Sequence, residues 1–225
     1  MSEIAKQIKA IADLGLAPLL KQAGFRKRGT HYARVKGEAL QLINVQSSQW
    51  NMSSQGRFTL NIGVHFSSVA KMLMGADRMP AVPKHYYCLR RKRVGQLLPD
   101  KADRWWTVAP QTNASDVAAE LSSAMNDYVL PWLTKVETIS GVAMELERGP
   151  DPLSGGLWTA PAARLVLGEP ERAGELARTM LDDLSNELKS CHPGNKALLT
   201  SHIEKLNQWV VDHNLLGFTK AEKAQ

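Results

Sequence analysis

The chain has 225 residues, of which 44% are hydrophobic and 22% charged, an ordinary composition for a globular protein. No apolar stretch approaches the ~20 residues that span a bilayer, and residues 1–15 lack the continuous apolar core of a signal peptide. We therefore expect a soluble protein with no membrane partner. Cys88 and Cys191 stand far apart and suggest no disulfide framework, so we expect a reducing compartment, the cytoplasm.

Charge is divided unevenly along the chain. Residues 1–110 carry 18 Lys/Arg and 6 Asp/Glu, a net charge of +12, whereas residues 111–225 carry 10 and 16, a net charge of −6. This asymmetry suggests an acidic partner for the first part, or mutual attraction between the two parts. A solvated basic surface without a partner accounts for the charge equally well.

The first elements are helical. Isoleucines at helical spacing predict a short amphipathic helix over residues 4–11. Pro18 suits the first turn of a second helix over residues 19–23, and Gly24 is a natural stop after it.

Three strands are expected next, over residues 30–35, 39–46 and 57–66, with Lys36-Gly37 as the turn of the first hairpin. The third has the strictest pattern in the chain, because apolar and polar residues alternate throughout it. A period of two predicts a half-buried strand, so the three form an antiparallel meander with helices on its apolar side.

The rest of the chain reads as irregular over residues 67–103, a short strand over 105–108 and a helix over 116–137, which Pro131 kinks or ends. Residues 149–156 have the composition of a linker. Helices follow over about 170–190 and 196–213, and residues 165–184 read as a helical hairpin resembling one tetratricopeptide-type unit.

The predicted fold class is therefore α+β, with a small antiparallel sheet flanked by helices and a helical C-terminal extension. We expect an α+β domain over residues 1–137, a linker over 138–156 and the helical extension over 157–225.

Several segments in order resemble a family of uncharacterised bacterial proteins, catalogued only as a domain of unknown function, over roughly residues 5–136. These segments are Gly24–Gly29 with Tyr32, Ile43–Trp50, Arg57–Val64, Cys88–Arg90, Arg93–Leu98 and the pair Trp105-Trp106. The combination is specific, although no single segment is. The resemblance supports the fold class and implies no activity.

The sequence has none of the motifs that mark phosphate-binding loops, dinucleotide sites, zinc proteases or serine hydrolases. His85 and Cys88 have a spacing that metals use, and His31 and His65 can come from neighbouring strands, but a structural zinc site closes with four ligands. We therefore expect no metal and no cofactor. The absence of these catalytic motifs also favours a protein that is not an enzyme.

One candidate site is the polar face of the predicted sheet. Alternation places Arg57, Asn61 and His65 on one face of their strand, and Asn44 and Gln46 share a face of the preceding strand. Such a face can hydrogen-bond a ligand or a peptide, with His65 the one nominee for a general base. A merely solvated face is the usual alternative.

A second candidate is the basic run Arg90–Arg93 with Trp105 and Trp106, from which we single out Arg90 and Arg93 as binding residues. Arg and Trp suit phosphate contacts and base stacking, and they are equally common at the centres of protein interfaces. One of the two tryptophans is expected in the core, because neighbours alternate across a strand.

The leading hypothesis is a protein-binding module, immunity- or adaptor-like, which binds an acidic partner through this basic surface. The alternatives are nucleic-acid binding by the same surface, and an enzyme or small-molecule-binding protein that uses the polar sheet face. The sequence leaves partner identity and oligomeric state open.

Overall fold

The structure is a computed structural model that describes residues 2–74, 83–149 and 158–219. The chain divides into two compact units. The first comprises Met1–Phe66 and Pro80–Thr138, and the second comprises Ser67–Met79 and Ile139–Gln225. The first unit holds the sheet and the second is helical, so the predicted α+β class with a helical C-terminal part is confirmed.

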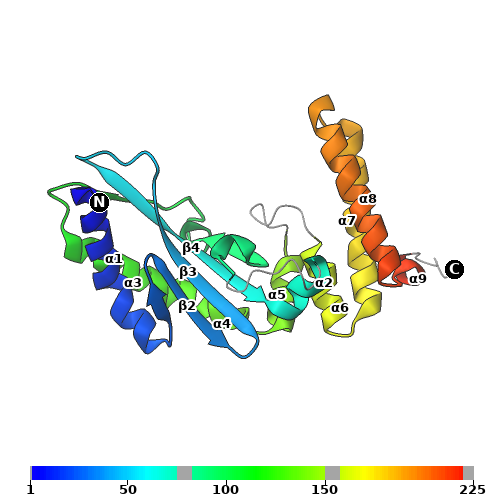
Figure 1. Cartoon of the computed structure of the whole chain (residues 1–225), viewed down its shortest axis with the longest axis horizontal. Coiled ribbons are helices and arrows are strands. Elements are labelled where there is room, and N and C mark those ends of the chain that lie inside the picture. The colour runs from blue at the N-terminus through cyan, green and yellow to red at the C-terminus, as the bar shows by residue number, and fades with distance from the viewer. Residues whose placement is uncertain (1, 75–82, 150–157, 220–225) are drawn as a thin grey trace. The chain divides into compact units, whose positions relative to one another are not determined.

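Six strands of the described residues form one antiparallel sheet in the first unit (Figure 1). The order is β1-β2-β3-β4-β5, and β6 pairs with β4 along the same edge as β5. The strands are β1 (Arg26–Arg28), β2 (His31–Lys36), β3 (Ala39–Ser47), β4 (Gly56–Phe66), β5 (Arg90–Arg93) and β6 (Trp106–Val108). The meander β2-β3-β4 thus occupies the three segments expected from alternation.

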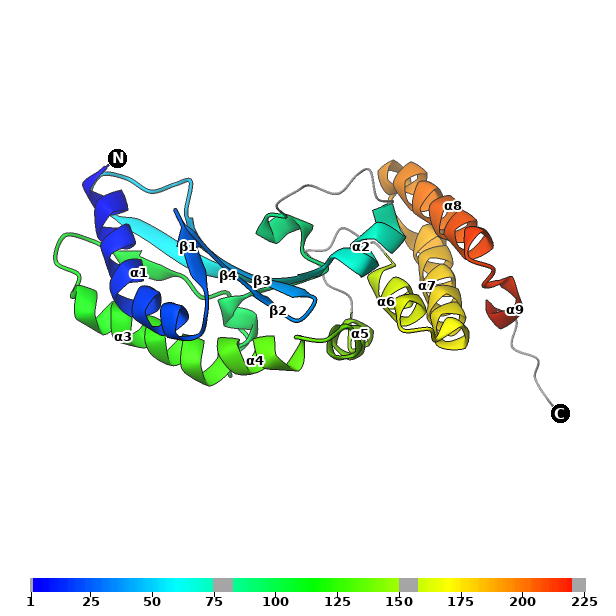
Figure 2. The ribbon, with the colours of Figure 1, turned by 60° about the horizontal axis from the view of Figure 1, so that its bottom comes forward.

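The apolar face of the sheet carries the core of the first unit. Phe58, Leu60, Ile62, Val64 and Phe66 of β4 are completely buried. Helices α1 (Glu3–Gln22), α3 (Ala114–Ala124) and α4 (Leu130–Lys135) lie on this side of the sheet (Figure 2). Each large side chain moved from water into such a core contributes about 1.5–3 kcal/mol. The alternation predicted a half-buried strand, but β4 is buried on both faces, and Arg57 is its one exposed residue.

Helix α1 is continuous where the sequence suggested two helices. Pro18 lies inside it, and Ser2 caps its start by accepting a hydrogen bond from the backbone of Ala5 at 3.3 Å. Proline leaves the carbonyl of residue i−4 without a partner. Here Leu14 and Pro18 both lie on the exposed side of the helix, so water can satisfy that carbonyl and the helix continues.

The helix expected over residues 116–137 runs as α3, a wider π-helical turn over Met125–Val129, and α4. Pro131 stands in the first turn of α4. Because its ring would collide with the carbonyl four residues back, the chain widens by one residue there and continues.

The segment expected to be irregular, residues 67–103, contains regular structure. Helix α2 (Ser67–Met74) follows β4, and the short helices η2 (His85–Tyr87) and η3 (Val94–Gln96) flank strand β5. Strand β5 consists of four basic residues, which carry no apolar alternation, and it forms because its backbone pairs with the edge of β4. Residues 75–82 of this segment lie outside the described residues.

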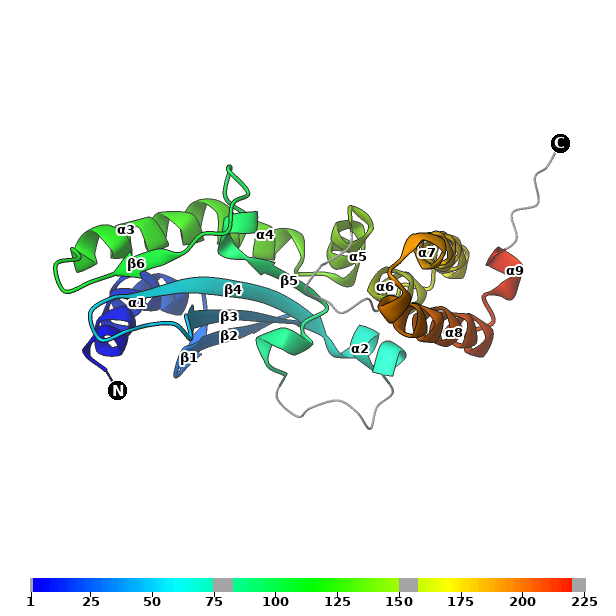
Figure 3. The same ribbon diagram turned by 90° about the horizontal axis from the view of Figure 1, so that it is seen from above.

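The second unit consists of helices α2, α5 (Ile139–Glu147), α6 (Thr159–Val166), α7 (Pro170–Ser190), α8 (Lys196–Asp212) and α9 (Leu216–Thr219). Figure 3 shows α6, α7 and α8 packed side by side. The hairpin of α6 and α7 turns at Gly168, whose φ is 77°, and the completely buried Ala173 and Ala177 allow close packing.

Helix α5 occupies residues that the sequence analysis assigned to the linker over 138–156. Its side chains Val142 and Ala143 are completely buried and Leu146 nearly so, which is the spacing of one helical face. Residues 150–156 of the expected linker lie outside the described residues. Within the described residues, no helix combines the length and the hydropathy needed to cross a bilayer.

Candidate functional site

The candidate site is built on the polar face of the sheet. Antiparallel pairing aligns one polar side chain from each of five strands in a single row, because directly paired residues share a face. The members of this polar row are Arg28, His31, Asn44, Asn61 and Arg93, in the order β1 to β5. The row therefore joins residues that lie 65 positions apart in the chain.

Amide side chains form the centre of the polar row. The Asn61 amide donates to Oε1 of Gln46 at 2.7 Å and to Oδ1 of Asn44 at 3.4 Å. The Asn44 amide in turn lies 3.1 Å from Nε2 of His31, which accepts a hydrogen bond when the imidazole is neutral. Asn44 and Asn61 are only 6% and 9% exposed, so this network holds their amides in fixed orientations.

Burial and the charge of Lys84 both lower the pKa of His31. Both effects favour the neutral imidazole, which is the form that can accept a hydrogen bond from Asn44.

Trp105 lies beside the amides with an arginine on either side. Continuing the β4–β6 register places it next to Thr59, between the positions of Arg57 and Arg93. The guanidinium carbons of Arg57 and Arg93 lie 5.0 and 5.2 Å from the indole centroid, within the range of cation–π attraction. This Arg57–Trp105–Arg93 stack presents two guanidinium groups beside the buried amides.

Asp103 fixes this stack from one end. It accepts two hydrogen bonds from Nη1 of Arg93, at 3.1 and 2.9 Å, and one from the Trp105 indole nitrogen at 2.8 Å. Burial alone would raise the pKa of Asp103, but the hydrogen bonds from Trp105 and Arg93 outweigh it and lower that pKa. Arg57, by contrast, is exposed and makes no hydrogen bond to a carboxylate among the described residues, although its charge helps to lower the pKa of Asp103.

Strand β5 divides the basic run between the two faces of the sheet. Arg91 and Arg93 pair with Gly63 and Asn61 on the polar face, whereas Arg90 and Lys92 pair with Val64 and Ile62 on the apolar face. Arg90 is only 7% exposed. Arg90 therefore lies on the opposite face from Arg93, with which the sequence analysis grouped it in one basic surface.

Two further candidates also lie away from the open part of the polar face. Trp106 stacks on Phe58 of the apolar face with ring centroids 5.6 Å apart, and its indole nitrogen donates to Glu120 at 3.1 Å. His65 is 1% exposed and its Nδ1 lies 3.1 Å from the carbonyl oxygen of Tyr87. Burial lowers the pKa of His65 although that hydrogen bond opposes the shift, and an enclosed imidazole cannot reach a substrate on the open face.

The segment around η2 covers one end of the polar face. Cys88 packs directly over Gly63, where an added Cβ would lie 2.5 Å from the Cys88 sulfur. His85 approaches His31, with ring centroids 6.1 Å apart. Burial raises the pKa of the Cys88 thiol far above its usual range, so this cysteine is unreactive.

The sequence reasoning missed His31 and Asp103 as parts of the site. The Lys36-Gly37 hairpin offered a signal for His31, since a tight turn there fixes the register that places it opposite Asn44. Nothing local marked Asp103. The described residues contain no group of three or more His, Cys, Asp or Glu side chains arranged to hold a metal ion.

The fold and the site define an α+β protein whose sheet has one covered face and one face with ordered polar side chains. The family model described as Domain of unknown function (DUF4304) matches residues 16–135, more than half of the chain. The chain belongs to this family, and the resemblance inferred from its motifs is confirmed. No curated protein and no solved structure matches the chain.

Proposed function

We propose that the polar face binds an acidic segment of a protein partner. The observation that carries this proposal is the Arg57–Trp105–Arg93 stack beside the fixed amides of Asn44 and Asn61. Guanidinium groups bind carboxylates through two parallel hydrogen bonds, and an indole beneath them limits their motion before the partner arrives.

The surroundings of Trp105 favour a protein over a nucleic acid. Stacking of a base requires an open aromatic face, and the Trp105 indole has a guanidinium close to it from each of two neighbouring strand positions. The same contacts suit carboxylates, which approach the edges of the guanidinium groups and leave the indole covered. Arg and Trp are also the residues that most often dominate the energy of protein interfaces.

The proposal is tested by affinity capture from a host lysate, with and without nuclease, using the wild-type chain and the variant Arg57→Gln/Arg93→Gln. A hydrogen bond to a charged group contributes about 1.5–3 kcal/mol, so losing two guanidinium groups is expected to weaken capture at least tenfold. The matched control, Lys21→Gln/Lys205→Gln, removes the same charge at exposed positions and is expected to leave capture unchanged.

Two results would contradict the proposal. Equal loss of capture in both double variants would mean that net charge alone attracts the partner. Recovery of nucleic acid that nuclease and moderate salt remove would assign the surface to phosphate binding instead. Arg57→Lys adds a finer test, because it keeps the charge but removes the planar fork, so an intermediate loss is expected.

A further inference from the structure

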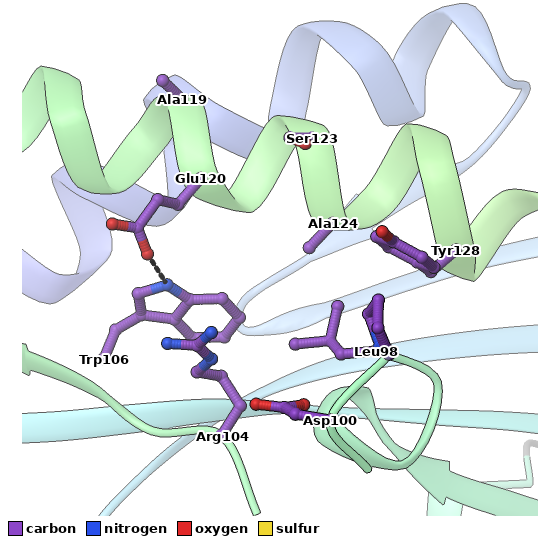
Figure 4. Close-up of a pocket in the computed structure, with 10 residues that line it drawn as sticks. Leu98, Asp100, Arg104, Trp106, Ala119, Glu120, Ser123, Ala124 and Tyr128 are labelled. Carbon is purple, nitrogen blue, oxygen red and sulfur yellow. Dashed lines mark hydrogen bonds between the residues drawn. The ribbon is translucent and has the colours of Figure 1, made fainter. Parts of the chain in front are cut away.

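A second recessed surface of the first unit lies away from the polar row. It is a pocket of about 660 Å³ between the segment that precedes β6 and one side of helix α3 (Figure 4). The residues that decide its chemistry are Leu98, Asp100, Arg104, Trp106, Glu120 and Tyr128. Its volume lies in the range of pockets that hold small molecules.

The wall formed by residues 98–104 is fixed by its backbone. A Cβ at Gly95 would lie 1.8 Å from the carbonyl oxygen of Ala102, so only glycine permits this approach. The Thr59 hydroxyl of the central strand donates to the carbonyl oxygen of Arg104 at 2.7 Å, which ties the wall to the sheet. This side of the pocket is therefore held in place before any ligand binds.

The opposite wall owes its shape to small residues and to the π-helical turn. Ala119, Ser123 and Ala124 of α3 line the pocket and leave room above Trp106. The widened turn that Pro131 causes includes Tyr128, which also lines the pocket. Figure 4 shows Arg104 and Tyr128 extending toward the pocket, one from the loop and one from the helix.

Charges of both signs meet in this pocket. The Arg104 guanidinium has no carboxylate partner in the described part of the chain, and the phenol of Tyr128 has no hydrogen-bond partner there. Asp100 accepts a bond from the backbone of Ala102 at 3.4 Å and is otherwise exposed. One oxygen of Glu120 accepts from the indole of Trp106 at 3.1 Å, which leaves its second oxygen for a ligand.

We infer that this pocket binds a small zwitterion, a free α-amino acid or dipeptide with a large apolar side chain. A simple anion would meet the carboxylates of Asp100 and Glu120, and a simple cation would meet Arg104. A zwitterion matches both, because its carboxylate pairs with Arg104 and its ammonium group with the second oxygen of Glu120. The apolar side chain lies on Trp106 and Leu98, which are 5% and 7% exposed.

The test measures binding to the full chain by isothermal titration calorimetry and by thermal shift, with phenylalanine and a phenylalanine-containing dipeptide as probes. N-acetylphenylalanine lacks the ammonium group and phenylalaninamide lacks the carboxylate. We expect at least one zwitterion to bind, and each blocked analogue to bind about two- to fivefold more weakly, because Arg104 and Glu120 are exposed and water screens the ion pair that the analogue loses. The probes are used at up to about 10 mM, which detects a Kd in the millimolar range. If neither zwitterion binds, or if the blocked analogues bind as well as the zwitterions, the inference is overturned.

Variants assign the two ends of the ligand. Arg104→Gln is expected to remove most of the preference for phenylalanine over phenylalaninamide, and Glu120→Gln to remove most of the preference for phenylalanine over N-acetylphenylalanine. Glutamine at position 120 still offers an oxygen to the Trp106 indole, so the fold is kept. The control Lys101→Gln removes a neighbouring exposed charge and is expected to change neither preference. If Lys101→Gln alters both ligand preferences as strongly as Arg104→Gln and Glu120→Gln do, the inference is wrong.

Discussion

Replacing Gly63 with alanine tests whether the segment around Cys88 really closes one end of the polar face. The new methyl group would lie 2.5 Å from the Cys88 sulfur and 2.8 Å from its Cβ. Ordinary contact needs about 3.5–4.0 Å, so the segment must shift by about 1 Å. Overpacking of this kind costs about 1–3 kcal/mol, and a loss of 2 kcal/mol lowers Tm by about 4–8 °C in a chain of this size.

The assay is a thermal melt of Gly63→Ala, together with the rate at which Cys88 reacts with a thiol reagent in a Cys191→Ser background. We expect a lower Tm and a faster reaction. Cys88→Gly removes both clashing atoms. The double variant Gly63→Ala/Cys88→Gly should therefore lose less unfolding free energy than the sum of the losses in the two single variants, by at least about 1 kcal/mol. Unchanged stability of Gly63→Ala, or strict additivity with Cys88→Gly, would refute the reasoning.

The remaining predictions concern pH and one ion pair. Burial first, and neighbouring charges second, lower the pKa values of His31 and His85. Near pH 6 the unfolded chain therefore binds more protons than the folded chain, so stability falls as the pH drops. The urea midpoint should be highest above pH 6.5 and fall as the pH drops to 5.5. This fall in the midpoint should be smaller in His85→Gln, which lacks one of the two imidazoles. Glu147 bonds Arg164 in the second unit, where their side chains are 16% and 14% exposed. Glu147→Gln should cost about 1–2 kcal/mol in chemical denaturation, and Glu175→Gln, whose pair is exposed, close to nothing.

The sequence predicted strands β2, β3, β4 and β6 because apolar residues mark each of them. It missed β1, which consists of three basic residues although it pairs with its chain neighbour β2. Alternation in residues 57–66 is strict because one face of the strand packs apolar side chains against the helices and the other buries polar side chains, and the preceding hairpin is set by its turn. Strand β5 could not be found in this way, because four basic residues have no apolar period and their pairing partner lies about 30 positions away. The sequence predicted two helices where α1 is one, because the position of Pro18 in the sequence does not reveal that it lies on the side of the helix that faces water.

The site was predictable to the same extent. Period-two spacing placed Asn44, Gln46, Arg57 and Asn61 on shared faces, and pairing joins them as residues of one polar surface. Arg90 could not be assigned to its face without the register of β5, which depends on long-range backbone pairing. Asp103 was unpredictable because a single loop carboxylate gives no pattern until Arg93 and Trp105 are in place around it.

The most direct test of the account is photocrosslinking on the polar face. Thr107 is exposed and pairs with Arg57, so a photoreactive amino acid at this position reaches a partner without removing any residue of the stack. The account predicts that irradiation in the host lysate yields a crosslinked protein at position 107, whose contact segment is acidic, and none at the control position Lys21. Crosslinking only to nucleic acid, or the same products from both positions, would contradict it.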